Sequence, residues 1–273
     1  MSWLFKLRGE VPKQWRLVLE LIGVGILFLF WVLVSSGSTP IMAPNVMPPP
    51  AKVLAAYGDM YADNNLIQNL FRSIGLNLAG YLKALLLTIP LGFAIGLYPL
   101  FKGMYQRPID AVRFVPLAAT TSLFIVWFGI SVPMKVNFLA FGIFIFLLPI
   151  VVQRINEVKD VYLKTVYTIG ATDWQTIRTV YIPSVFSKLI DDIRILTAIS
   201  WTYIVVVETI NAEEGGLGAM TYMARRLSRV DKMFAILILF IIIGIVQDRI
   251  FARLDKEIFP HKYQVKNQHK HGK

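Results

Sequence analysis

The sequence predicts an all-α, polytopic membrane protein with about six transmembrane helices. Its 273 residues are 56% hydrophobic and only 16% charged, whereas soluble domains carry about 25% charged residues. Six runs of the chain also approach the roughly 20 mostly apolar residues that a helix needs to cross the hydrocarbon core. These runs are 17–34, 74–100, 114–130, 136–153, 185–207 and 233–251.

The first four runs are the clearest spans. The run 17–34 precedes a proline-rich tract instead of a small-residue cleavage site, so we expect it to remain as a span. In the second run, Pro90 predicts a kink, and Gly92 and Gly96 predict the close approach of another helix. Lys83 lies inside this run, where an ionisable side chain usually faces protein or water.

The last two runs have shorter apolar parts. The fifth run carries four charged residues near its start, and the sixth contains a purely apolar stretch of only 14 residues, MFAILILFIIIGIV. At about 1.5 Å per residue, such a stretch is about 21 Å long as a helix. Its flanking residues must therefore complete the crossing.

The distribution of basic residues predicts the orientation. With six spans, 19 Lys and Arg lie on the side of the two termini and 7 lie on the other side. By the positive-inside rule, both termini are cytoplasmic. The chain then divides into a cytoplasmic N-terminal segment (1–16), a transmembrane domain (17–254) and a basic cytoplasmic tail (255–273).

Composition excludes several other functions. The chain has no cysteine, which excludes disulfides and thiolate metal sites. Its three histidines, His261, His269 and His271, are all near the C-terminus, so we expect no metal site in the spans. No G-x-x-x-x-G-K-[ST] motif is present to bind a nucleotide. We attribute the net charge of +11 to membrane insertion and expect no nucleic-acid partner.

A cytoplasmic segment, about 156–183, interrupts the apolar runs. It contains YTIGATDWQTIRTVYIPSV (167–185), in which Gly170 can end one helix and Thr172 or Asp173 can cap the next. Pro183 is expected to stop that second helix before the fifth span. An amphipathic helix here is either a docking element or an interfacial helix that rests in the lipid headgroups.

This segment resembles a signature of the permease subunits of bacterial ABC importers, E-A-A-x3-G-x9-I-x-L-P. The spacing from Gly170 to Pro183 matches, although Lys164, Thr165 and Val166 stand where the family has E-A-A. Other tracts resemble the nitrate, sulfonate, taurine and bicarbonate branch of these permeases. They are RPIDAVRFVP (107–116), VWFGIS (126–131), IPSVFSKLIDDIRI (182–195) and VVVETINAEEGGLG (205–218).

The resemblance implies a type I importer permease in the bacterial inner membrane. Its partners would be a second permease copy (identical or paralogous), two ABC ATPase subunits, a periplasmic or lipid-anchored binding protein, and lipids. The chain would not be an enzyme and would bind no cofactor, since ATP-Mg would be used by the ATPase. The cytoplasmic segment would be the coupling helix, with Trp174 as the anchor. Candidate coupling residues are Lys164, Gly170, Ala171, Asp173, Trp174, Arg178 and Pro183.

Polar residues elsewhere give further candidates. Glu208 and the hydroxyls of Thr120, Thr121 and Ser122 could line the translocation path, although a hydroxyl in a helix often bonds to a carbonyl of that helix. Arg194 is expected to pair with Asp191 or with a second copy, and the sequence gives no role for Asp191 and Asp192. The residues Arg225, Arg226 and Arg229 form an outer cluster that could bind a partner protein, lipid phosphates or an anion.

Two other classes are weaker interpretations. A membrane-embedded enzyme would need clustered polar groups near one interface, and a channel or secondary transporter would not need the cytoplasmic signature. Within the importer class, the resemblance favours an oxyanion such as nitrate, sulfonate, taurine or bicarbonate. Relatives in the same branch also carry neutral or cationic heterocycles of the thiamine-precursor pyrimidine type.

Overall fold

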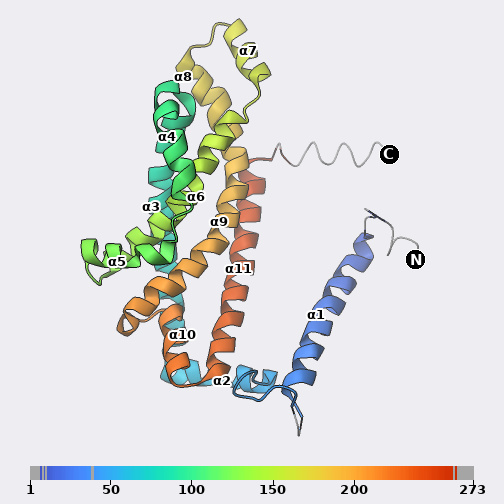
Figure 1. The fold of residues 1–273 in the computed structure, drawn as a ribbon. Helices are drawn as coiled ribbons and strands as arrows, with labels where there is room; N and C mark the ends of the chain where they lie inside the picture. Colours follow the sequence, from blue (N-terminus) through green and yellow to red (C-terminus); the bar gives the residue numbers. More distant parts are fainter. Residues whose placement is uncertain (1–6, 8, 10, 38–39, 261, 263–273) are drawn as a thin grey trace. The chain divides into compact units, whose positions relative to one another are not determined.

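The computed structural model describes residues 7, 9, 11–37, 40–260 and 262, which form helices and short connections (Figure 1). The predicted segments 1–16 and 255–273, with all three histidines, lie partly or wholly outside the described residues. The α-helices are α1 (Lys13–Ser35), α2 (Pro50–Asp63), α3 (Leu66–Leu97), α4 (Pro99–Val112), α5 (Leu117–Phe128), α6 (Val132–Asn156), α7 (Asp160–Thr168), α8 (Asp173–Thr176), α9 (Ile182–Ile210), α10 (Leu217–Arg226) and α11 (Val230–Ile258). A π-helical turn (Ile177–Tyr181) precedes α9, and a 3-10 turn (Ala212–Glu214) follows it.

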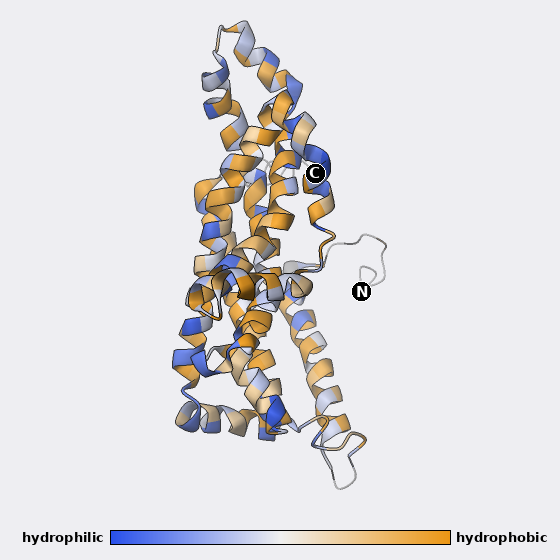
Figure 2. Cartoon of the chain, turned by 60° about the vertical axis from the view of Figure 1, so that its left-hand side comes forward, coloured by the Kyte–Doolittle hydropathy of each residue, from blue (hydrophilic) through white to orange (hydrophobic). Residues whose placement is uncertain are grey.

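Within the described part of the chain, five helical segments are long and apolar enough to cross a membrane, and a sixth crossing is available if the bent pair α4–α5 counts as one span. This agrees with the predicted number of about six. Figure 2 shows the long helices mainly orange, with hydrophilic residues concentrated toward their ends. The chain divides into two compact units, Leu66–Met223 with Ile238–Lys273 and Met1–Asn65 with Ala224–Leu237.

The core of the larger unit lies where α3, α6 and α9 meet. Buried side chains from all three helices form one cluster, which includes Tyr81, Ile143, Val151, Val185 and Leu189. Small residues on α3 bring its backbone close to α6. A Cβ atom added to Gly92 would lie 2.5 Å from Val151 of α6. One added to Gly80 would lie 2.6 Å from Leu139, and one added to Gly96 would lie 2.7 Å from Ile155.

Replacing Gly92 with alanine is therefore expected to destabilise the protein by about 1–3 kcal/mol, as overpacking of a filled core does. The added methyl would meet the Cβ and Cγ1 atoms of Val151, whose χ1 is fixed by branching at Cβ. Gly244→Ala on α11 is a matched control, because no atom lies within 4 Å of the added Cβ. The measurement is the midpoint of thermal aggregation in detergent; equal midpoints for the two variants would contradict the close approach.

The third predicted span, 114–130, is wrong as a single helix. The helix there, α5, has only 12 residues, about 18 Å at the α-helical rise. Pro116 directly precedes it and disfavours a helical conformation at the residue before, and Gly129 ends it at φ +67°. The preceding helix α4 meets α5 at 106°. Together they form either a broken span or a re-entrant pair.

The smaller unit ties α2 to the start of α11. The Tyr57 hydroxyl donates to the carbonyl of Ala235 at 2.7 Å, and the Arg229 guanidinium contacts Asp59 at 2.7 Å and Asp231 at 2.8 Å. Two carboxylates thus hold Arg229 in place, whereas Arg225 and Arg226 are exposed. Of the predicted outer cluster, Arg229 has a structural role in this unit. Binding of a partner by the cluster stays a prediction.

Candidate coupling site

The segment predicted to be cytoplasmic folds as two short helices joined by a tight cap. After α7, Gly170 adopts φ +82°, a conformation that suits glycine. Its N–H donates to Tyr167 O at 3.0 Å, and the N–H of Ala171 donates to Val166 O at 3.1 Å. This pair of bonds is the Schellman motif. Gly170 therefore ends the helix as the sequence predicts.

The next helix begins with a capping box. The Thr172 hydroxyl accepts from the N–H of Gln175, and the Gln175 side chain accepts from the N–H of Thr172. This reciprocal pair satisfies two otherwise unbonded donors at the helix start. Of the two predicted caps, Thr172 is the one used, and Asp173 instead accepts from the Tyr167 hydroxyl at 3.0 Å. The bond from Tyr167 to Asp173 fixes α7 against α8.

The prediction that Pro183 stops this helix is wrong. The chain stays helical from Asp173 to Ile210, a run of 38 residues. Proline lacks an N–H and its ring clashes with the carbonyl four residues earlier. Just before Pro183 the helix widens into a π-helical turn, in which the N–H of Ile182 donates to Ile177 O. The wide turn accommodates the proline, so the helix that begins at Asp173 is continuous with α9.

Most of the predicted coupling residues are exposed. The side chain of Trp174 is 68% exposed, and Lys164, Asp173, Arg178 and Pro183 are exposed too. A ring that is mostly exposed, and that lies outside the apolar part of a helix, contributes little to the stability of the fold. The arrangement leaves Trp174 available to a second surface.

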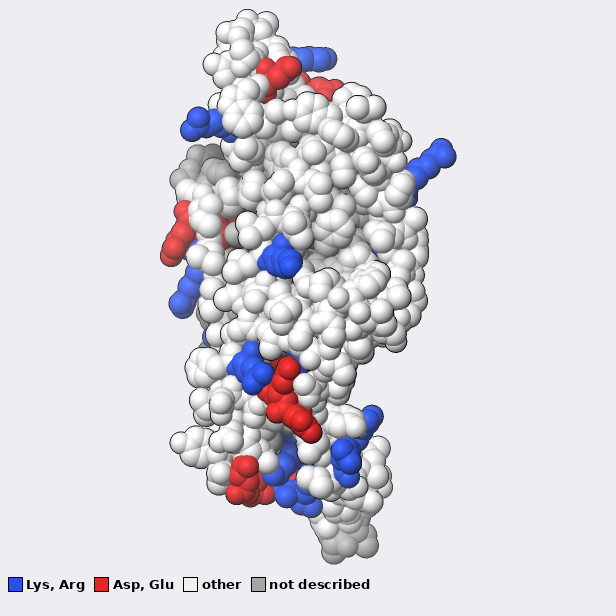
Figure 3. Space-filling view, turned by 90° about the vertical axis from the view of Figure 1, so that its left-hand side faces the viewer, with Lys and Arg blue, Asp and Glu red and all other residues white. Residues whose placement is uncertain are grey.

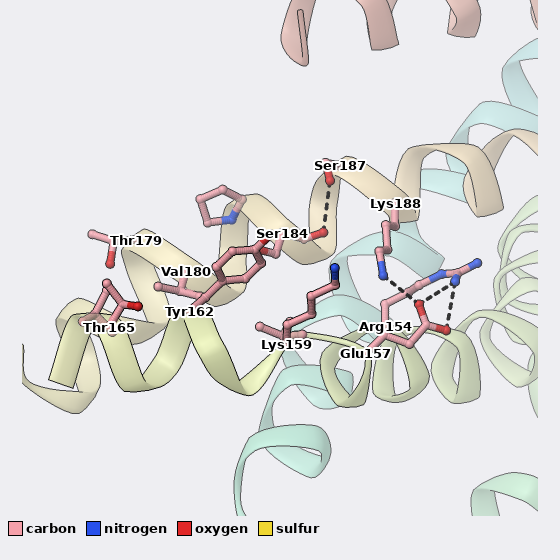
Figure 4. Close-up of a pocket in the computed structure, with 13 residues that line it drawn as sticks. Arg154, Glu157, Lys159, Tyr162, Thr165, Thr179, Val180, Ser184, Ser187 and Lys188 are labelled. Carbon is pink, nitrogen blue, oxygen red and sulfur yellow. Dashed lines mark hydrogen bonds and ion pairs between the residues drawn. The ribbon is translucent and has the colours of Figure 1, made fainter. Parts of the chain in front are cut away.

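A groove of about 530 Å³ lies between α7 and the start of α9 (Figure 4). Tyr162, Thr165 and Val166 of α7 line it opposite Thr179 and Val180 of the π-helical turn. At its inner end lie Arg154, Glu157 and Lys188, joined by ion pairs.

These charges belong to a network that joins the end of α6 to α9. The Arg154 guanidinium donates to both oxygens of Asp192, at 2.7 Å each, and to Glu157 at 2.8 and 3.1 Å. Lys188 donates to Glu157 at 3.0 Å. The network thus gives Asp192 a partner that the sequence analysis did not identify. The spacing of Arg154 and Glu157, three residues apart at the start of the cytoplasmic segment, was the available signal.

Donation from Arg154 and Lys188 lowers the pKa of Glu157 from 4.5 to about 2. A depressed carboxyl pKa stabilises the folded state above the unfolded pKa, and that stability is lost as the pH falls from 4.5 toward about 2. We expect the difference in thermal midpoint between the wild type and Glu157→Gln to be constant at neutral and mildly acidic pH. It should shrink below 4.5. Scanning fluorimetry in detergent measures it; a difference that already vanishes near neutral pH would contradict the assignment.

The other predicted intramembrane charges have partners within the larger unit. The expected pairing of Arg194 with Asp191 is wrong, because the Arg194 guanidinium contacts both carboxylate oxygens of Asp248 on α11. Asp191 instead pairs with Lys262 at 3.1 Å. This bidentate guanidinium–carboxylate pair is geometrically specific, and it joins α9 to α11. Lys83 of α3 donates to the side chain of Asn137 on α6.

Glu208 is 1% exposed, and its carboxylate is held by the larger unit. The Ser73 hydroxyl donates to it at 2.6 Å and the N–H of Gly218 at 2.7 Å. These contacts favour a structural role in fixing the start of α10 over a place in the translocation path. Nearby Lys135 is 2% exposed and pairs with Glu214 at 2.6 Å.

The predicted hydroxyls of α5 are not equivalent. Thr120 donates to the carbonyl of Leu117 in its own helix at 2.7 Å, which was the alternative interpretation. The Thr121 hydroxyl is buried without a hydrogen-bond partner, and Ser122 is exposed. In Figure 3, charged side chains are few over a broad central area of the face shown. Among the described residues, no cluster of His, Asp or Glu could hold a metal ion.

Comparison with known proteins gives one consistent result. The model of a family described as "Binding-protein-dependent transport system inner membrane component" matches residues 88–260. The taurine transport system permease protein TauC of Escherichia coli is 25% identical, with 95% of each chain covered. A putative aliphatic sulfonates transport permease protein, SsuC of Bacillus subtilis, is also 25% identical, with 90% of this chain and 88% of that protein covered. The fold is similar to an inward-facing structure of the MetNI methionine ABC transporter (TM-score 0.63, 16% identity, 71% of this chain and 95% of that one).

Proposed function

The chain belongs to the family of binding-protein-dependent transport system inner membrane components, and is thus a permease subunit of an ABC importer; from this we propose that it forms the path for a small sulfonate, of which taurine is the first candidate. The similarity to the taurine and aliphatic sulfonate permeases over nearly the whole chain supports this solute class. The translocation path itself would be built with a second permease copy.

The coupling role rests on segment 160–181, which is largely exposed and is capped at Gly170 and Thr172 between its two helices. The second of these helices runs without a break into α9. We propose that a separate ATPase subunit docks there, with Trp174 as a buried anchor in the complex. Exposed tryptophans that become buried at an interface are frequent hot spots. ATP binding would then select one of two permease conformations through its differential affinity for them.

The experiment is purification of the tagged protein from its own membranes in mild detergent, followed by mass spectrometry of the proteins recovered with it. An ATPase with a P-loop motif and an extracytoplasmic binding protein are the expected partners. That binding protein is then titrated with taurine, an alkanesulfonate, nitrate, bicarbonate and a formylaminopyrimidine. Recovery of no ATPase, under conditions that preserve other importers, would exclude the docking proposal. Binding of only the pyrimidine would exclude the sulfonate.

We also propose that both termini lie in the cytoplasm, because the basic residues of the six-span model gather on that side. The cysteine-free chain suits a direct test, since each introduced cysteine is the sole thiol. Lys164→Cys should react with a membrane-impermeant maleimide only after the membrane is opened, and Lys52→Cys should react in intact spheroplasts. The reverse pattern would overturn the orientation.

A further inference from the structure

We propose that the ion-pair network of Arg154, Glu157, Lys188 and Asp192 holds α6 and α9 in register, so that movement of the coupling segment reaches both helices together. We call this network the staple, and we call the place where the chain leaves α6 and returns to α9 the neck of the coupling segment. These four are positioning residues, and the proposal rests on the coupling role proposed above.

The network lies where the coupling segment leaves the membrane part of the chain and returns to it. The coupling segment leaves the membrane part of the chain after α6 ends at Asn156 and returns to it at the start of α9, Ile182. Arg154 and Asp192 are 38 residues apart in sequence, and Glu157 and Lys188 are 31 apart. Their ion pairs therefore close the loop formed by the whole docking segment. The four charges lie where the two ends of this loop meet.

The ion pairs add to apolar packing between the two helices. Near the network, Ile155 of α6 packs in the same cluster as Val185 and Leu189 of α9. Interdigitated apolar side chains resist sliding, but each atomic contact is individually weak. A guanidinium that bonds both oxygens of one carboxylate has a fixed geometry. The pair of Arg154 and Asp192 thus adds a directional constraint on the axial register of α6 and α9.

The positions of the four charged residues in their helices support the same constraint on axial register. Lys188 and Asp192 are one turn apart on α9, and so share a face. Arg154 contacts Asp192 and Glu157, and Glu157 contacts Lys188, so the four charges form a continuous chain across the neck. Asp192 is 8% exposed, so its pair with Arg154 is shielded from solvent on the side of α9. A shift of either helix along its axis would break these bonds.

The first test uses Arg154→Lys and Asp192→Asn in the complex purified from native membranes. Lysine keeps the charge of arginine and loses the bidentate geometry. We expect the ATPase to stay bound, and taurine uptake per ATP hydrolysed in proteoliposomes to fall about threefold to thirtyfold, the range for mutations within a coupling network. Arg16→Lys is a matched control, because Arg16 forms an ion pair with Glu20 on α1, away from the neck.

A second readout is independent of the solute and of the ATPase. Nitroxide labels on T165C and T179C stand on opposite walls of the groove, and the chain offers no other thiol. Electron paramagnetic resonance should give a narrow label-to-label distance distribution for the parent protein and a broader one with Arg154→Lys. An unchanged distribution together with unchanged uptake per ATP would overturn the staple. If the wild-type complex fails to carry taurine while the distribution still broadens, the solute proposal fails and the staple stands.

Discussion

Replacing Trp174 with alanine is expected to weaken binding of the ATPase subunit by about 30-fold or more, because a tryptophan hot spot contributes about 2 kcal/mol or more. The reason is geometric. The ring is 68% exposed on a helix whose start is fixed by the capping box of Thr172 and Gln175. The free protein therefore loses little when the ring is removed, and the cost falls on the complex.

The measurement is the affinity of the purified ATPase for the permease in nanodiscs, compared with the thermal midpoint of the permease alone. Trp15→Ala on α1 is the matched control, because that tryptophan is also exposed and lies outside the coupling segment. We expect Trp174→Ala to reduce affinity at an unchanged midpoint. Unchanged affinity would support the alternative in which the segment rests in the lipid headgroups.

Replacing Gly216 with alanine is expected to destabilise the protein by about 3 kcal/mol or more, the largest effect of any glycine in the connection between α9 and α10. Gly216 has φ +106°, outside the region open to residues with a Cβ atom. The added Cβ would lie 2.3 Å from the carboxylate of Glu208. That carboxylate cannot retreat without losing its bonds to Ser73 and Gly218.

Gly75→Ala on α3 is the control for this variant, since no atom lies within 4 Å of its added Cβ. There alanine should be neutral or stabilising by up to about 1 kcal/mol, as expected in a helix. The thermal midpoint and the yield of monodisperse protein in detergent distinguish the Gly216→Ala variant from the Gly75→Ala variant. A Gly216→Ala protein as stable as the Gly75→Ala protein would mean that Glu208 does not clamp this connection.

Local signals in the sequence were sufficient for much of the fold. Hydrophobic length located the long spans, and the spacing around Gly170 located the cap between α7 and α8. One failure concerns Pro183. Pro183 was expected to stop a helix because its effect was judged on an α-helical turn, and the π-helical turn that accommodates it depends on neighbouring residues.

Charge partners were the least predictable part of the site. Asp191 is close to Arg194 in sequence, but the observed partner of Arg194 is Asp248 on α11, 54 residues from Arg194. Such pairs depend on which helix faces which, information that a single sequence carries only weakly. The network of Arg154 and Asp192 was missed for the same reason. The candidate coupling residues are close together in the chain, so a local signature could group them, and their coupling role stays a prediction.

The π-helical turn has a further consequence for the direction of the docking face. A turn closed by a bond to the fifth preceding residue holds one residue more than an α-helical turn. The extra residue is taken up within that one turn, so the helical residues before and after it keep the directions that they would have in an uninterrupted α-helix. Deleting a single residue between Ile177 and Tyr181 would therefore restore an ordinary α-helical turn and leave Trp174 pointing in its present direction. Over evolution, the wide turn allows this segment to gain or lose one residue without turning the docking face away from the ATPase and without altering the side chains that pack within the membrane.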